Sequence, residues 1–197
     1  VVYGGYVEGH AGADAAGIGG GETGNGQSVR IYGGTVWGWG YAEGGADRNN
    51  SYGAGIGGGQ DGDSGDILIY GGKVYGYGGM DAAGIGTGEE TTDHSIGTDN
   101  IHFYGGTVYA EGHGCASGIG SGEGRSQWGD ILIHDATVTA VGGEHGAGIG
   151  SGEGGALQAR VKRDGNANVT ATGGSDAAGI GGGDEGEKNS SGLVVIA

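Results

Sequence analysis

Short apolar segments alternate with glycine-rich polar stretches along the whole chain, and the apolar positions return in register. The phrase Ala-Gly-Ile-Gly occurs five times, and a sixth copy has Ser in place of Ala. Successive isoleucines of this phrase are separated by 38, 29, 34, 30 and 31 residues. A unit of about 30 residues written six times predicts a solenoid, with insertions confined to the loops beside the phrase. The isoleucines are Ile18, Ile56, Ile85, Ile119, Ile149 and Ile180.

Each unit contains three short segments that read as strands. In the second unit they are residues 29–32, 35–39 and 54–57, and Gly33-Gly34 separates the first two. Such a glycine pair suits a corner with positive φ or a tight bend. Three strands and three corners in one unit predict an all-β fold, a right-handed, three-sided parallel β-helix of about six coils with open, uncapped ends. At about 4.8 Å per coil, the rod would be roughly 29 Å long.

The alternation of period two indicates which side chains face the interior of the coils. The predicted core is therefore three columns of stacked apolar side chains. The first column holds Ile31, Ile69, Phe103 and Ile133, the second holds Val7, Val36, Val74, Val108, Val138 and Val169, and the third holds the six isoleucines of the repeated phrase.

The pattern predicts a single domain, residues 1–197, that consists of consecutive repeats. The spacing from Val161 to Val169 is three residues longer than that from Ile133 to Val138, which predicts a bulge or loop at residues 163–166. The predicted repeats span residues 1–28, 29–66, 67–100, 101–130, 131–160 and 161–192, followed by a terminal strand at 193–197.

Three stretches share a sequence pattern similar to Gly-Thr-Val-Thr-Ala: Gly34-Thr35-Val36, Thr137–Gly143 and Val169–Gly174. In this pattern the chain resembles the glycine-rich parallel β-helix modules of secreted and surface proteins of bacteria, over its entire length. The resemblance implies an extracellular or cell-surface protein of the adhesin, carbohydrate-binding or stalk type. It does not name an activity, because so many functions share the fold. The Trp and Tyr residues of the early coils depart from the Thr-rich pattern.

The amino-acid composition limits the kinds of partner that the chain can bind. The chain has 58 Gly, no Pro and a net charge of −16 with only eight Lys and Arg, so we expect no nucleic-acid partner. No apolar run approaches the ~18 residues of a membrane span, so we expect no membrane insertion. The single Cys115 cannot form an internal disulfide.

Two outward columns of aromatic residues follow from the predicted register. Trp37, Tyr75 and Tyr109 form one, and Trp39 and Tyr77 form the other beside it. These rings are candidates for a platform that binds a glycan through its C–H faces. The alternative is a cross-strand ladder that only stabilises the sheet. A further ladder beside the glycine corner is interpreted as structural: Tyr3, Tyr32, Tyr70, Tyr104 and His134.

An acidic column is predicted at the start of the loops that follow the repeated phrase, and it is the candidate metal site. Oxygen-rich loops favour Ca²⁺, and the densest local cluster is Asp61, Asp63 and Asp66. The alternative is an acidic edge that only solvent and glycine N–H groups stabilise. The column itself consists of Glu22, Gln60, Glu89, Glu123, Glu153 and Asp184.

A column of mixed chemistry lies four residues before each isoleucine. Its Cys115, together with His113, Glu111 and His145, is weighed as a transition-metal site or a nucleophile, but no motif fixes a geometry. A packed structural cysteine is the preferred interpretation. We expect no enzyme, because paired acids in a cleft are not evident, and no ice-binding face, because the threonines form no regular array. The column reads Asp14, Tyr52, Asp81, Cys115, His145 and Asp176.

The two ends of the rod carry apolar strands, which predict end-to-end stacking or flanking domains. The favoured hypothesis is an extracellular structural rod, either a stalk or a filament subunit, because the periodic features all serve stacking. The alternative is an adhesin or carbohydrate-binding module that uses the aromatic platform. The predicted assembly residues are Val1, Val2, Leu193, Val194, Val195 and Ile196.

Overall fold

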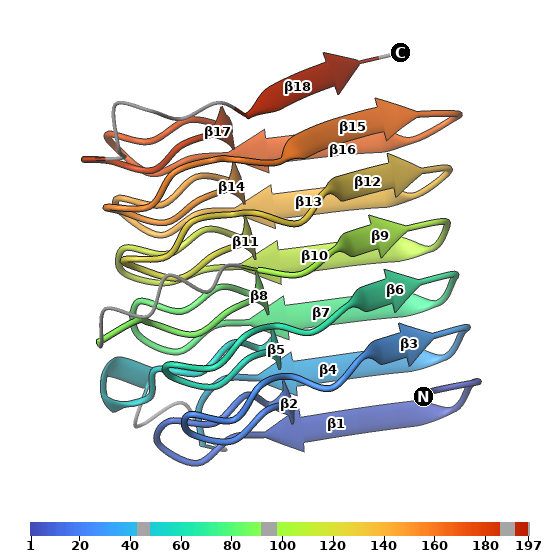
Figure 1. The fold of residues 1–197 in the computed structure, drawn as a ribbon. Helices are drawn as coiled ribbons and strands as arrows, with labels where there is room; N and C mark the ends of the chain where they lie inside the picture. The colour runs from blue at the N-terminus through green and yellow to red at the C-terminus, as the bar shows by residue number, and fades with distance from the viewer. Residues whose placement is uncertain (43–47, 92–97, 186–191, 197) are drawn as a thin grey trace.

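The chain winds into a three-sided parallel β-solenoid of six coils. The computed structural model describes residues 1–42, 48–91, 98–185 and 192–196. These residues form three parallel sheets of six strands, one sheet for each side of the coil (Figure 1). The 3₁₀ turn at Arg48–Asn50 is the one helical element among them. The predicted all-β parallel solenoid is confirmed.

Each sheet collects one strand from every coil. The first contains β1 (Tyr6–His10), β4 (Thr35–Trp39), β7 (Lys73–Tyr77), β10 (Thr107–Glu111), β13 (Thr137–Val141) and β16 (Asn168–Thr172). The second contains β2 (Ile18–Gly19), β5 (Ile56–Gly57), β8 (Ile85–Gly86), β11 (Ile119–Gly120), β14 (Ile149–Gly150) and β17 (Ile180–Gly181). The third contains β3 (Val29–Ile31), β6 (Ile67–Ile69), β9 (Ile101–Phe103), β12 (Ile131–His134), β15 (Arg160–Asp164) and β18 (Leu193–Ile196).

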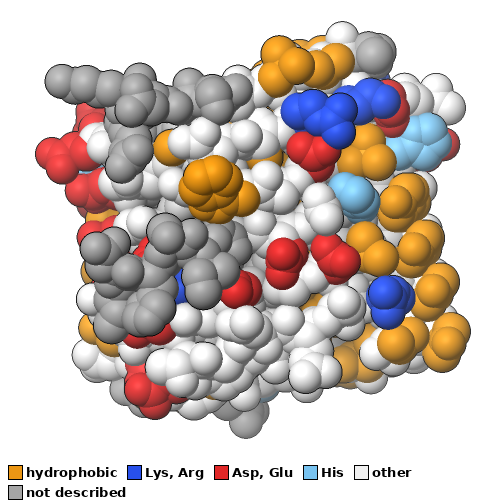
Figure 2. Space-filling view, viewed as in Figure 1, with side chains coloured by type: hydrophobic (Ala, Val, Ile, Leu, Met, Phe, Trp, Pro, Cys, Tyr) orange, Lys and Arg blue, Asp and Glu red, His pale blue; other side chains and the backbone are white. Residues whose placement is uncertain are grey.

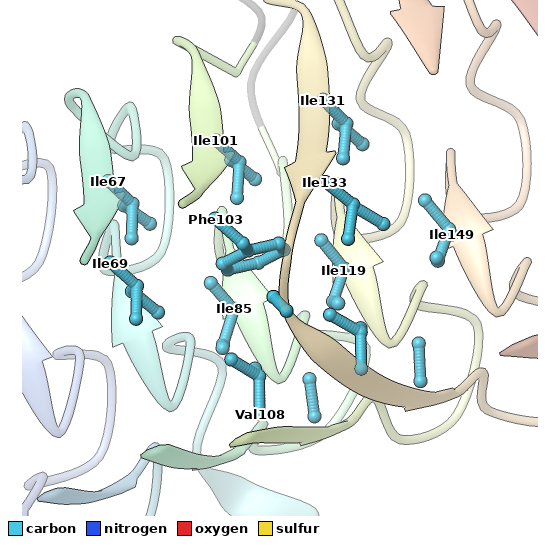
Figure 3. Packing of buried hydrophobic residues seen from close by; sticks show 14 of the residues in the cluster. Ile67, Ile69, Ile85, Ile101, Phe103, Val108, Ile119, Ile131, Ile133 and Ile149 are labelled. Carbon is cyan, nitrogen blue, oxygen red and sulfur yellow. The ribbon is translucent and has the colours of Figure 1, made fainter. Parts of the chain in front are cut away.

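The register between neighbouring coils places equivalent residues side by side. Val36 pairs with Val74 in the first sheet, and Ile56 pairs with Ile85 in the second. The predicted core columns are confirmed, and their central members are fully buried. Figure 3 shows isoleucines of successive coils pointing into the same interior, with Phe103 among them. A fourth inward column, which the sequence analysis did not single out, stands two residues before the first: Val29, Ile67, Ile101 and Ile131.

The sixth coil differs from its prediction. Val161 pairs with Ile131, not with Ile133, and the partner of Ile133 is Arg163. Since Asn168 then pairs with Thr137, the connection between the two strands is one residue longer than in the fifth coil, not three. The predicted loop is present as a turn at Gly165 and Asn166, but its extra length was overestimated because the prediction assumed an apolar residue at every inward position. The Arg163 guanidinium stands at that position instead, where its Nε donates to the carbonyl of Ala167 at 2.9 Å.

Candidate functional site

The acidic column and the mixed column, predicted separately, lie side by side. The amide N–H of a residue in the acidic column donates to the carbonyl of the mixed-column residue one coil earlier. We call the two columns together the acidic stripe. In Figure 2, acidic side chains gather at the loop edge of the molecule. The bonds are Gln60 to Asp14 (2.8 Å), Glu89 to Tyr52 (3.0 Å), Glu123 to Asp81 (3.0 Å), Glu153 to Cys115 (2.7 Å) and Asp184 to His145 (2.9 Å).

Carboxylates in the middle of the acidic stripe are held close to one another and partly out of water. Burial raises the pKa of Glu123, and the negative charges of Asp81, Glu89 and Glu153 raise it further. Burial also raises the pKa of Glu89, although the Gln60 amide, which donates to its Oε2 at 2.8 Å, opposes the shift. The stripe is therefore a region of negative potential that favours protons or cations.

One cluster within the acidic stripe comprises Asp81, Cys115 and Glu123, whose ligand atoms lie within 4.8 Å of one another. The Asp81 Oδ1 already accepts the N–H of Cys115 at 2.8 Å. Burial raises the pKa of the Cys115 thiol, and its hydrogen bond to Glu153 adds to the shift. A raised pKa disfavours the thiolate, which is the nucleophilic form of cysteine.

The other residues weighed with Cys115 point to different partners. Glu111 forms an ion pair with Arg48, with 3.0 Å between Oε1 and Nη1. His113 Nε2 lies 3.2 Å from Asn49 Oδ1. The structure thus brings Cys115 together with Asp81 and Glu123, not with Glu111 and His113.

A second cluster within the acidic stripe comprises His145, Asp176 and Asp184, again with ligand atoms within 4.8 Å of one another. The His145 Nδ1 lies 3.5 Å from Asp184 Oδ2 and 4.0 Å from Asp176 Oδ2. The sequence analysis placed these residues in two different columns. What it lacked was the backbone register that joins the columns one coil apart.

The predicted cluster of Asp61, Asp63 and Asp66 does not converge on a common point. Asp61 accepts the N–H and the hydroxyl of Thr91 at 2.8 and 2.7 Å, and Asp66 accepts the Asn100 amide at 3.2 Å. Asp63 faces Arg125, with 3.4 Å between Oδ1 and Nη1. Among the described residues, these three carboxylates form no joint ligand set.

Arg125 is a buried residue that the sequence analysis missed. Its side chain is 0% exposed, and its Nε also lies 4.0 Å from Glu90 Oε2. Arg125 stands six residues after Ile119, where four other coils have glycine in the sequence: Gly24, Gly62, Gly155 and Gly186. An arginine at a position that is usually glycine was the sequence signal that could have identified this residue. Its buried guanidinium offsets the negative charge of the surrounding acidic loops.

The predicted aromatic columns exist as stacks. The ring centroids of Trp37 and Tyr75 are 4.0 Å apart at an interplanar angle of 15°, and those of Trp39 and Tyr77 are 4.2 Å apart at 8°. Because the stacked residues belong to neighbouring coils, the ring faces are turned along the rod axis toward one another. The rings consequently present mainly their edges to solvent.

Tyr109 departs from this arrangement. Its ring is tilted by 42° against that of Tyr77 at 5.6 Å, and its hydroxyl donates to Glu111 Oε2 at 2.8 Å. Burial, followed by the hydrogen bond to Glu111, raises the pKa of Tyr109 to about 12. Tyr109 thus links the aromatic columns to the Arg48–Glu111 ion pair.

The tyrosine ladder beside the glycine corner also stacks from coil to coil. Centroid distances are 5.3 Å for Tyr3–Tyr32, 4.7 Å for Tyr32–Tyr70 and 5.0 Å for Tyr70–Tyr104. Figure 2 shows hydrophobic side chains along the edge opposite the acidic loops. His134 turns instead to Asp164, with 2.6 Å between Nδ1 and Oδ1.

The predicted assembly residues lie at the two ends of the rod, on β18 and at Val1 and Val2, where Val2 forms an isolated bridge with Ile31. Leu193, Val194 and Ile196 of β18 are exposed, as is Val1, while Val2 and Val195 are partly buried. One edge of β18 pairs with β15.

Comparison with known proteins agrees with the coil geometry. A family model described as Beta helix repeat matches residues 29–60, 104–123, 131–153 and 164–184. No curated protein and no solved structure gives a significant match. The described residues include no helix with the length and hydropathy of a membrane span. The chain is thus similar to β-helix repeat proteins over these four segments, and its described residues form a parallel β-solenoid.

Proposed function

We propose that the chain is an extracellular structural rod, either a stalk segment or a subunit of an end-to-end filament. One observation carries the proposal: interactions inside and outside the coil run along the rod axis, from one coil to the next. The core columns stack within the coils, and the stacked Trp and Tyr rings repeat this pattern on the outside. Such an arrangement stiffens a rod and leaves few side chains directed at a common external ligand.

The role we propose is not catalytic. The acidic stripe distributes its carboxylates along the rod, and the Cys115 thiol is held protonated. Support for a filament comes from the apolar side chains exposed on β18, since an unpaired strand edge with apolar side chains favours strand addition. Ca²⁺ bound at the acidic stripe would reduce the repulsion between its carboxylates. We therefore include calcium binding in the proposal.

Negative-stain electron microscopy of the purified chain, with and without a Ca²⁺ chelator, tests the rod. Long fibres of uniform width are the result that the filament version expects. Isolated short rods would contradict the filament and leave the stalk, in which flanking domains continue the coil. Loss of fibres on chelation alone would assign the calcium to assembly.

The end strand provides the sharper test of the filament. Deleting residues 193–197 should abolish fibres while circular dichroism stays that of a β protein. Trp128→Lys is the matched control, because Trp128 is an exposed apolar residue between β11 and β12, away from both ends of the rod, and it should leave the fibres intact. Fibres that persist after the deletion would refute assembly through β18.

A carbohydrate-binding module is the second candidate, and the cluster of Trp37, Trp39, Tyr75, Tyr77 and Tyr109 on three neighbouring strands favours it. The double variant Trp37→Ala/Trp39→Ala should then lose glycan binding on an array. The variant Tyr32→Ala, in the tyrosine ladder, should keep it. Unchanged glycan affinity in the double variant would contradict this candidate.

A further inference from the structure

The end of the acidic stripe nearest β17 brings an imidazole and two carboxylates from two successive coils to one point. His145 follows β13 in the fifth coil, while Asp176 and Asp184 flank β17 in the sixth. Their ligand atoms lie within 4.8 Å of one another. The solenoid register alone creates this meeting, because Asp184 N–H donates to the carbonyl of His145 at 2.9 Å.

The His145 Nδ1 is the unusual atom of the cluster. It is buried from solvent and makes no hydrogen bond within the described part of the chain. Its distances to Asp184 Oδ2 and Asp176 Oδ2, 3.5 and 4.0 Å, are long for hydrogen bonds. A buried imidazole nitrogen that faces two carboxylates without a hydrogen bond is positioned as a metal ligand would be.

The two carboxylates are positioned from outside the cluster. The N–H of Glu185 donates to Asp184 Oδ1 at 2.8 Å, which leaves Oδ2 directed at His145. The hydroxyl of Ser175 donates to Asp176 Oδ2 at 3.0 Å. Hydrogen bonds of this kind orient the ligands of metal sites.

The separations fit a small divalent ion. Around tetrahedral Zn²⁺, with bonds of about 2.0–2.2 Å, ligand atoms stand about 3.3–3.5 Å apart. The observed 3.5 Å already matches this separation, whereas the 4.0 Å would need to contract by about half an ångström. The two carboxylates lie within 4.8 Å of each other and would also move closer. An imidazole nitrogen excludes Ca²⁺ as the preferred ion, since Ca²⁺ takes oxygen ligands, whereas Zn²⁺ accepts both donor types.

We propose that His145, Asp176 and Asp184 bind a divalent transition-metal ion of the Zn²⁺ type, which joins the fifth coil to the sixth. The ion has three protein ligands and completes its coordination with solvent. It neutralises two carboxylates at one end of the acidic stripe and stabilises the rod between these coils. This site is independent of whether the rod is a stalk, a filament or a glycan-binding module.

The Asp81, Cys115 and Glu123 cluster provides the internal comparison. It offers a thiol in place of the imidazole, so an ion bound there would be distinguished by its sulfur ligand. His134 provides a second comparison, because it also lies between two aspartates. However, Asp164 faces its Nδ1 and Asp135 faces its Nε2, so the three groups cannot surround one ion.

Isothermal titration of the chelator-treated chain with Zn²⁺ tests the site. We expect one ion per chain, and His145→Ala and Asp184→Asn should each weaken binding by about 100-fold or more, since even outer-shell changes cost 10–100-fold. His134→Ala should leave the affinity unchanged, and circular dichroism should show that each variant keeps its β structure. Absence of binding by the unaltered chain would reduce the cluster to an ion pair and overturn the proposal.

Substitution with Co²⁺ gives a readout that needs no variant. Nitrogen and oxygen ligands should produce visible d–d bands without a sulfur-to-metal charge-transfer band in the near ultraviolet. A charge-transfer band that disappears in Cys115→Ser would place the ion at the other cluster and overturn the proposal. Equal binding in His145→Ala and the unaltered chain would do the same.

Discussion

At the scale of single residues, the repeated phrase is explained by what each position contacts. The isoleucine fills the core, while the glycine after it adopts a φ of +132 to +148° in every coil. At Gly86 (φ +145°), a Cβ atom would collide with the carbonyl oxygen of Gly120 in the next coil. The residue is glycine both because the backbone conformation is almost closed to other residues and because the coils approach too closely for a side chain.

Gly86→Ala should therefore destabilise the rod by about 3 kcal/mol or more, through strain at a positive φ and displacement of the neighbouring coil. Thermal or denaturant unfolding followed by circular dichroism measures the effect. Gly21→Ala is the control, because a Cβ at Gly21 meets nothing within 4 Å, and its stability should stay within about 0.5 kcal/mol of the original. Equal stability of the two variants would refute this account of the phrase.

At the scale of the elements, each strand is short, and its side chains find their partners one coil away. Phe103 of β9 is fully buried between Ile69 and Ile133, its register partners on β6 and β12. A column of this kind requires apolar volume at each level but accepts different shapes. A core position is thus set by its neighbours above and below and only weakly by its own strand.

Phe103→Ala should cost about 3–5 kcal/mol, the usual effect of removing a buried aromatic ring. Phe103→Ile is the matched variant, because isoleucine already fills the equivalent position in the coils on either side, and it should cost less than about 1.5 kcal/mol. Chemical denaturation of both variants decides the matter. An isoleucine variant as unstable as the alanine variant would show that the aromatic shape itself is required.

At the scale of the whole molecule, electrostatic repulsion between acidic side chains destabilises the stacked coils. The net charge is −16, and the register aligns equivalent carboxylates into the acidic stripe. Glu89 and Glu123 have pKa values above the ordinary 4.5, with burial as the first cause. Asp130 and Asp164 have pKa values below the ordinary 3.8, because of their hydrogen bonds to Arg160 and Lys162.

Protonation of Glu89 and Glu123 should therefore raise the melting temperature as the pH falls toward about 4.5. Burial lowers the pKa of His102 and of His113 from the ordinary 6.5, so these two histidines oppose the rise as the pH falls below 6.5. The folded chain holds protons on Glu89 and Glu123 more tightly than the unfolded chain does, so their contribution is complete below pH 4.5 and is lost as the pH rises through their raised pKa values. Below pH 3.8 the melting temperature should fall again, as Asp130 and Asp164 become protonated. Calorimetry across this range measures the profile.

The double variant Glu89→Gln/Glu123→Gln separates the acidic stripe from the overall charge. It should raise the melting temperature at pH 7 and flatten the profile between pH 7 and 4.5. Glu144→Gln and Glu185→Gln remove the same charge at exposed positions outside the centre of the stripe, and they should change the profile less. A profile that is equally steep in all variants would assign the effect to net charge.

The predictability of the candidate sites differs from column to column. The aromatic columns were predictable as far as their residues, because outward alternation fixes which rings neighbour each other. Their ring orientation was not, since Tyr109 tilts away to reach Glu111. The His145 cluster was not predictable, because its three ligands belong to two columns that the sequence leaves unrelated.

The sequence by itself determined the coil: the repeat, the three strands, the glycine corners and the inward columns. It could do so because each of these depends on a local period and on contact with an equivalent residue one unit away. Only the tertiary structure decided which residues of different columns come into contact. It brought the two columns of the acidic stripe together across neighbouring coils, set Arg163 at an inward position and placed Arg125 in the interior. The reason is that the offset of one column relative to another depends on the conformation of the loops between the strands.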